Sequence, residues 1–182
     1  MRMSDRAVGR FSVALLADRI DLVEAVAELR WREWGHPPEP GALAWWVDAA
    51  RREAGREELP VTFVAVDAAG EVAGAVGLGH VDLQEQRDRS PWLLGMIVRA
   101  DCRGTGVGRL LLMHLEAWAA QHEYGRIWVA TSRAVGFYRA CGWRVIETLP
   151  RGPGRPTAVL TKALGQRCDT EPSAETADRS GW

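Results

Sequence analysis

Residues 92–119, WLLGMIVRADCRGTGVGRLLLMHLEAWA, decide the fold of this chain. The first seven residues form a continuous apolar run, which predicts a buried central strand over 92–98 with Gly95 as a candidate bulge. Further on, Leu111, Leu115 and Trp118 recur at helical spacing, which predicts an amphipathic helix over 109–122. A short turn rich in glycine joins the two elements.

This turn has the features of a phosphate-binding site. The start of a helix leaves several backbone N–H groups unpaired at the positive end of the helix dipole. Gly104, Gly106 and Gly108 allow close approach, while Arg103 and Arg109 add positive charge. The dinucleotide pattern G-x-G-x-x-G fails because Arg109 stands in place of its third glycine, and no Gly-Lys-Ser/Thr of a P-loop follows. The motif is instead Arg103-x-x-Gly106-x-Gly108.

Strands and helices are predicted on both sides of this segment. The predicted strands cover residues 11–15, 61–66, 72–81, 127–130, 143–147 and 158–163, and the predicted helices cover 17–35, 42–54 and 133–140. Asp18 is the expected cap of the first helix. The pattern indicates a mixed sheet with helices on both faces, in one domain over residues 1–164. Residues 165–182 are polar, and we expect a disordered tail there.

Composition excludes several classes of protein. A chain of 182 residues with 47% hydrophobic and 26% charged content fits one soluble globular domain. Its net charge of -1 is not that of a polycation that coats nucleic acid, although residues 99–167 hold eleven basic side chains against four acidic ones. Three cysteines without a C-x-x-C pair favour a reduced, cytoplasmic protein. No apolar run approaches the length of a bilayer span, and we expect no metal site.

Two motifs resemble those of the GCN-related N-acetyltransferase (GNAT) superfamily. Arg103, Gly106 and Gly108 match its Q/R-x-x-G-x-G/A pyrophosphate signature, and AVGFYRACGW at 134–143 is similar to its A-x-x-F-Y-x-x-x-G-F/W segment. The resemblance extends over roughly residues 8–164. It implies an α/β fold with a central mixed, mostly antiparallel sheet of six or seven strands, a splayed central strand pair and about four helices on both faces.

The resemblance also implies an enzyme that transfers an acetyl group from acetyl-CoA to an amine, by direct attack in a ternary complex. Backbone groups of Met96, Ile97 and Val98 would bind the pantetheine arm. Ser132 would contact the same arm, and Phe137 would pack near the cofactor. The residues implied to hold the pyrophosphate, chiefly through backbone N–H groups, are Arg103, Gly104, Thr105, Gly106, Val107, Gly108 and Arg109.

Attack of an amine on a thioester requires a neutral nucleophile, a donor to the developing oxyanion and a proton for the thiolate. Tyr138 is the candidate proton donor near the sulfur; the alternative is a core aromatic whose hydroxyl makes a structural bond. The backbone N–H near Ile97 is the expected carbonyl polariser. His80 is the candidate general base, and a water relay is the alternative. Three acidic residues follow in the same segment, Asp82, Glu85 and Asp88.

The acceptor-binding regions of the superfamily are its first two helices and the loop after its third strand. In this chain those regions hold an acidic excess and five tryptophans, Trp31, Trp34, Trp45, Trp46 and Trp92. Aromatic walls beside carboxylates suit a small cationic amine, although half of the tryptophans could be ordinary core.

Two other functions remain open for this fold. One is an aminoacyl transferase with aminoacyl-tRNA as donor, whose positive surface would extend beyond the pyrophosphate site. The other is a non-catalytic protein that binds acyl-CoA or another ligand. The resemblance also implies a possible homodimer, whatever the function, in which the apolar strand over 158–163 pairs across the interface.

Overall fold

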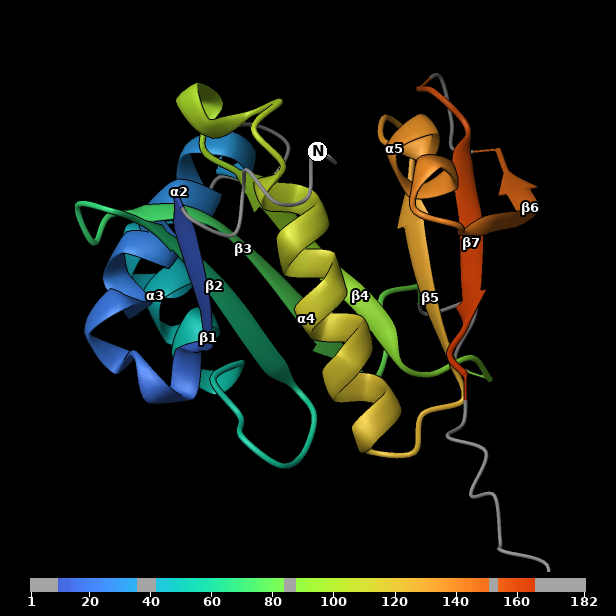
Figure 1. Ribbon diagram of the computed structural model, residues 1–182. Helices are drawn as coiled ribbons and strands as arrows, with labels where there is room; N and C mark the ends of the chain where they lie inside the picture. The colour runs from blue at the N-terminus through green and yellow to red at the C-terminus, as the bar shows by residue number, and fades with distance from the viewer. Residues whose placement is uncertain (1–9, 36–41, 84–87, 151–153, 166–182) are drawn as a thin grey trace, which may run out of the picture.

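A computed structural model describes residues 10–35, 42–83, 88–150 and 154–165, and it builds them around one seven-stranded sheet (Figure 1). The strands are β1 Phe11–Leu15, β2 Val61–Asp67, β3 Val72–Gly79, β4 Trp92–Val98, β5 Arg126–Thr131, β6 Arg144–Leu149 and β7 Thr157–Ala163. Their order in the sheet is β1-β2-β3-β4-β5-β7-β6. The pairing of β4 with β5 is parallel and every other pairing is antiparallel. The predicted mixed, mostly antiparallel sheet is confirmed.

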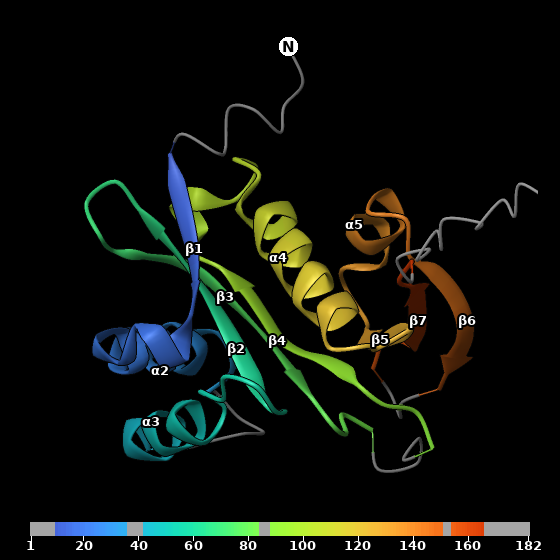
Figure 2. The same ribbon diagram turned by 60° about the horizontal axis from the view of Figure 1, so that its bottom comes forward.

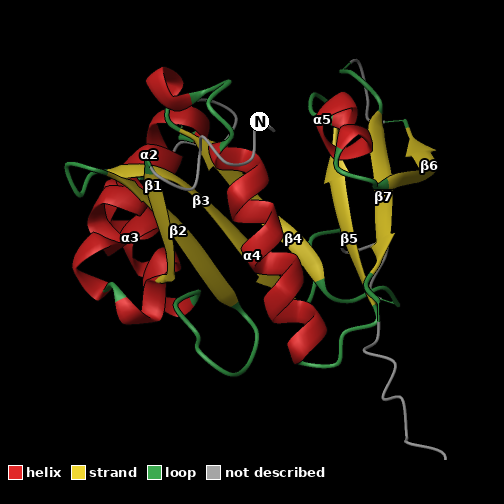
Figure 3. Cartoon of the chain, viewed as in Figure 1, coloured by secondary structure: helices red, strands yellow, loops and turns green. Residues whose placement is uncertain are grey.

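Helices cover both faces of this sheet (Figures 2 and 3). On one face lie α2 Val23–Trp34 and α3 Leu43–Arg52; on the other lie α4 Val107–Gln121 and α5 Val135–Ala140. Successive side chains of β2 point to opposite faces of the sheet. Phe63 packs on the α4 side and Val64 on the α2 side. None of the helices in the described ranges has the length and hydropathy that crossing a bilayer requires.

The centre of the sheet opens between β4 and β5. These strands pair only at Trp92 and Trp128, near the start of β4, and then diverge. The register of β4 on β3 shifts between Ala75 and Gly77, opposite Gly95, which has a φ of 53°. A positive φ is strained for residues other than glycine, so the bulge depends on Gly95. Both the splayed strand pair and the bulge agree with the sequence analysis.

The first helix differs from the prediction at its start. Two 3₁₀ turns, Leu16–Asp18 and Ile20–Leu22, precede α2. Leu16 and Leu22 are both buried, and tight turns bring two leucines six residues apart to the same core. Asp18 therefore lies before the helix and does not cap it; its carboxylate pairs with Arg56 instead.

Two other expectations change. Helix α4 begins at Val107, two residues earlier than predicted, because Gly106 already supplies the left-handed residue that starts it. Strand β7 lies between β5 and β6, so it has no free edge. The prediction that this strand pairs across a dimer interface is therefore wrong. The edge strand at this end of the sheet is β6. The predicted tail falls almost wholly on residues 166–182, outside the described ranges.

Candidate active site

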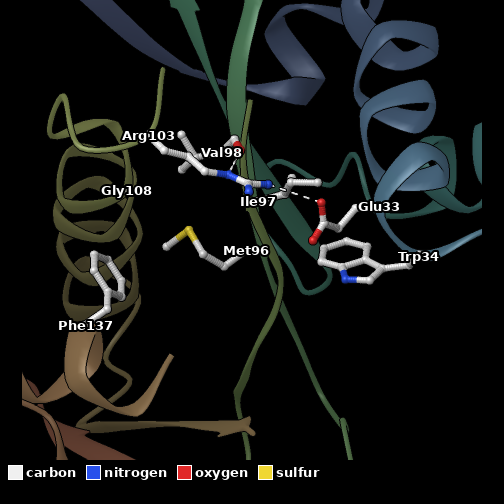
Figure 4. Close-up of a pocket in the computed structure, with 8 residues that line it drawn as sticks. All are labelled: Glu33, Trp34, Met96, Ile97, Val98, Arg103, Gly108 and Phe137. Atoms are coloured by element: carbon white, nitrogen blue, oxygen red, sulfur yellow. Dashed lines mark hydrogen bonds and ion pairs between the residues drawn. The ribbon is translucent and has the colours of Figure 1, made fainter. Parts of the chain in front are cut away.

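A cleft of about 240 Å³ lies along β4, where β5 diverges from it (Figure 4). Backbone and side chains of Met96, Ile97 and Val98 form its floor. The walls come from elements far apart in the sequence: Glu33 and Trp34 of α2, Arg103 of the turn, Gly108 of α4 and Phe137 of α5. The structure thus brings together six of the residues assigned to the donor site from the sequence.

The N-terminus of α4 provides the anion-binding end of this cleft. Gly106 is the N-cap residue with a φ of 97°, and no side chain in the described ranges caps this end. The N–H groups of the first turn, at Val107, Gly108 and Arg109, are left for a ligand. A Cβ on Gly108 would lie 3.3 Å from the ring of Phe137, so glycine lets α5 approach the turn.

The side chain of Arg103 spans the cleft from β4 to α2. Its Nε donates to the carbonyl oxygen of Val98 at 3.1 Å, and its Nη2 donates to the carboxylate of Glu33 at 3.2 Å. Figure 4 shows the guanidinium between these two groups. Glu33 was missed by the sequence analysis, because nothing near it in the sequence connects it to a residue 70 positions away.

Thr105 and Ser132 stand apart from the lining of the cleft. The hydroxyl of Thr105 donates to the carbonyl of Cys102 at 2.6 Å and so closes the turn. Ser132 is exposed just beyond the end of β5. Neither residue is among those that line the cleft.

Tyr138 lies behind Phe137 in the wall of the site. It is 3% exposed and packs against Phe137 and Trp143, with ring centres 5.2 and 5.4 Å apart. Burial raises the pKa of its phenol, and the charges of Cys141 and Asp82 raise it further. The phenol is therefore protonated at neutral pH, which is the form that a proton donor needs. Phe137 contributes to the lining and Tyr138 does not.

His80 lies at the other end of β4 from the anion-binding turn. It is exposed and follows Gly79, which pairs with Trp92. Four residues of strand, about 13 Å, separate Trp92 from Met96. Of the acidic residues near His80, Asp82 and Asp88 are outside the lining of the cleft, and Glu85 lies outside the described residues.

The five tryptophans lie in the cleft, in the core or at the surface. Trp34 lines the cleft and stacks on Trp46 at 6.5 Å, and Trp45 meets Trp46 edge-on at 5.1 Å. Trp31 and Trp45 are exposed. Trp92 is fully buried and its indole N–H donates to the carbonyl of Arg89, so it belongs to the core, which the sequence analysis left open for half of the tryptophans. The Trp92 side chain packs in a small buried cluster with Leu83 and Val159.

Acetyltransferases are among the known proteins that are similar to this chain. A sequence model of the acetyltransferase (GNAT) family matches residues 23–143. Among solved structures, an aminoglycoside 6'-N-acetyltransferase complexed with coenzyme A is similar with a TM-score of 0.70 at 19% identity, over 87% of this chain and 99% of that one. The aminoglycoside 6'-N-acetyltransferase from Enterococcus faecium gives a TM-score of 0.67 at 16% identity, over 87% and 99%.

A protein-modifying enzyme shares the same fold. The ribosomal-protein-S18-alanine N-acetyltransferase from Escherichia coli gives a TM-score of 0.63 at 16% identity, over 88% of this chain and 98% of that one. No curated protein matches the chain by sequence. Similarity of fold alone therefore does not distinguish a small-molecule acceptor from a protein acceptor.

Proposed function

The chain belongs to the acetyltransferase (GNAT) family, as an N-acetyltransferase with acetyl-CoA as its donor, and we propose that its acceptor is a small cationic amine. The observation that carries this proposal is the composition of the α2 wall. Glu33 places a carboxylate and Trp34 an indole on the α2 side of the cleft. The carboxylate accepts from Arg103 at 3.2 Å and is 40% exposed, so it is also open to an amine. A carboxylate beside an aromatic face attracts an ammonium group, whereas an anionic or purely apolar acceptor would gain nothing from Glu33.

We assign the donor to the floor and the turn. Backbone groups of Met96 and Val98 would bind the pantetheine arm as a neighbouring strand would, because β5 has diverged and leaves them without a partner strand there. The unpaired N–H groups at the start of α4 would bind the pyrophosphate. Acetyl-CoA supplies an activated acyl group, and these residues hold it in one orientation.

The transfer itself forms a C–N bond and breaks the C–S bond. The amine nitrogen must lose a proton and the departing sulfur must gain one. We assign the second proton to Tyr138, whose raised pKa keeps its phenol protonated. His80 remains our candidate for the first proton; from its place at the end of β3 it would act through water. A backbone N–H near Ile97 would stabilise the carbonyl oxygen.

Release of CoA thiol from acetyl-CoA tests the proposal directly. The amines to compare are a polyamine, an aminoglycoside, an amino acid amide and a short peptide with a free N-terminus. We expect the polycationic acceptors to give the highest kcat/KM. Glu33→Gln should lower that value, whereas Glu28→Gln, an exposed position on the same helix, should not. A preference for the peptide, or activity that ribonuclease abolishes, would contradict the proposed acceptor.

A further inference from the structure

Arg30 carries a guanidinium that is buried between α2 and the bulge of β4. The residue is 5% exposed, and its Nη1 donates to the carboxylate of Glu53 at 2.6 Å. Glu53 is the residue that follows the last turn of α3. Burial of a charge is costly unless it is paired and hydrogen-bonded, so Arg30 must either serve the packing of the two helices or contribute to the reaction.

The pairing with Glu53 uses only one side of the guanidinium. The Nε and Nη2 atoms are buried and have no hydrogen-bond partner within the described ranges. If Arg30 only joined α2 to α3, a shorter cation or an apolar pair would fill this place without leaving two donors unsatisfied. The two buried donors that Glu53 leaves without an acceptor need a second explanation.

The two unpartnered nitrogens face Gly95. A Cβ built on Gly95 would lie 3.3 Å from both Nε and Nη2 of Arg30. Gly95 is also the bulge residue, and it immediately precedes Met96, Ile97 and Val98 on the floor of the cleft. Because glycine has no side chain, nothing separates the guanidinium from the backbone of β4 at the start of the donor-binding segment.

We propose that Arg30 is a positioning residue for acetyl transfer: its buried positive charge strengthens the backbone N–H groups of the β4 bulge that stabilise negative charge on the thioester oxygen. A fixed cation in a site of low dielectric constant favours that charge without having to reorganise during the reaction. Glu53 holds the guanidinium against Gly95 and opposes part of its field. This inference rests on acetyl-CoA as the donor and on the floor of the cleft as its place, and it is independent of which amine is the acceptor.

A purely structural ion pair and an electrostatic role predict different results for the two partners. For a structural pair, Arg30→Met and Glu53→Gln both lower stability and affect the donor site alike. For the proposed role, Arg30→Met removes the cation, whereas Glu53→Gln removes the charge that opposes it. The two substitutions should therefore act in opposite directions on the bound thioester, even if both lower the melting temperature.

The measurement is the infrared carbonyl band of acetyl-CoA labelled with ¹³C in the acetyl group, bound to the full-length protein without any amine. In the unsubstituted protein we expect the band at lower wavenumber than in free acetyl-CoA. Arg30→Met should move it back toward the free value, Arg30→Lys should keep most of the shift, and Glu53→Gln should keep or enlarge it. As a control, titration calorimetry measures the Kd of CoA for each variant. This Kd should differ by less than about twofold from that of the unsubstituted protein.

Steady-state rates give a second readout. We expect Arg30→Met to lower kcat by about three- to tenfold with little change in the KM for acetyl-CoA, and Glu53→Gln to leave kcat unchanged or higher.

An unshifted band in the unsubstituted protein, or an equal effect of Arg30→Met and Glu53→Gln on the band, would refute the role of Arg30. Failure of every amine in the thiol assay with an intact band shift would refute only the proposed acceptor. Where Arg30→Met does not fold, Arg30→Lys and Glu53→Gln decide the outcome.

Discussion

Substitution of Glu33 by Gln should tighten the binding of free CoA. In the structure Arg103 donates to the carbonyl of Val98 and is held there by Glu33. The pantetheine arm is proposed to use backbone groups of the same strand, so its binding requires Arg103 to leave Val98. Without the carboxylate the guanidinium is less firmly held across the cleft, and its displacement costs less.

The exposure of the pair limits the size of this effect. The side chains of Arg103 and Glu33 are 57% and 40% exposed, so solvent screens their attraction. Ion pairs of this kind contribute about 0.2–1 kcal/mol. The corresponding decrease in the Kd of CoA is about 1.5- to fivefold. A larger change would mean that Glu33 acts through something other than this contact.

A double-mutant cycle separates the contact from the general field of one negative charge. Titration calorimetry should measure the Kd of CoA for the unsubstituted protein, Glu33→Gln, Arg103→Met and the double variant. We expect the tightening by Glu33→Gln to disappear in the Arg103→Met background, and Glu28→Gln to have no effect. A tightening of the same size in both backgrounds would refute the reasoning, because it would show that the ion pair plays no part.

Three further predictions concern the turn, the acid and the core. Gly106→Ala should lower CoA affinity at least about tenfold, because a φ of 97° strains an alanine and displaces the N–H groups of α4; Gly142→Ala, with a φ of 86° away from the cleft, should destabilise the fold similarly without changing CoA affinity. Tyr138→Phe should lower kcat about 100-fold at unchanged KM for acetyl-CoA. Burial raises the pKa of Tyr138 above its ordinary 10.0, so the tyrosine contributes fully to stability below pH 10.0 and contributes less as the pH rises further. The decrease in the free energy of unfolding caused by Tyr138→Phe should therefore be smaller above pH 10.0 than below it. Leu111→Ala, at a fully buried position of α4, should lower the free energy of unfolding by about 2–5 kcal/mol in urea denaturation, and a loss below 1 kcal/mol would contradict the placement of that side chain in the core.

Elements whose structure depends on neighbouring residues could be predicted from the amino-acid sequence. The apolar run 92–98 is β4, and Gly95 is its bulge. The turn with Arg103, Gly106 and Gly108 is followed by an uncapped helix, as the motif indicates. These features follow from local chemistry: a positive φ favours glycine, and a continuous apolar run favours a strand at the centre of a sheet.

Which distant side chains meet depends on the packing of the whole chain. The tertiary structure placed Glu33 against Arg103 and Arg30 against Gly95, and it put Trp34 in the cleft but Trp92 in the core. It also placed β7 inside the sheet, which removes the free edge that the chain order alone had suggested. The physical reason is that such contacts depend on strand order and helix packing, which sum many weak interactions over the whole chain, whereas a turn or a bulge is fixed by the conformational limits of a few consecutive residues.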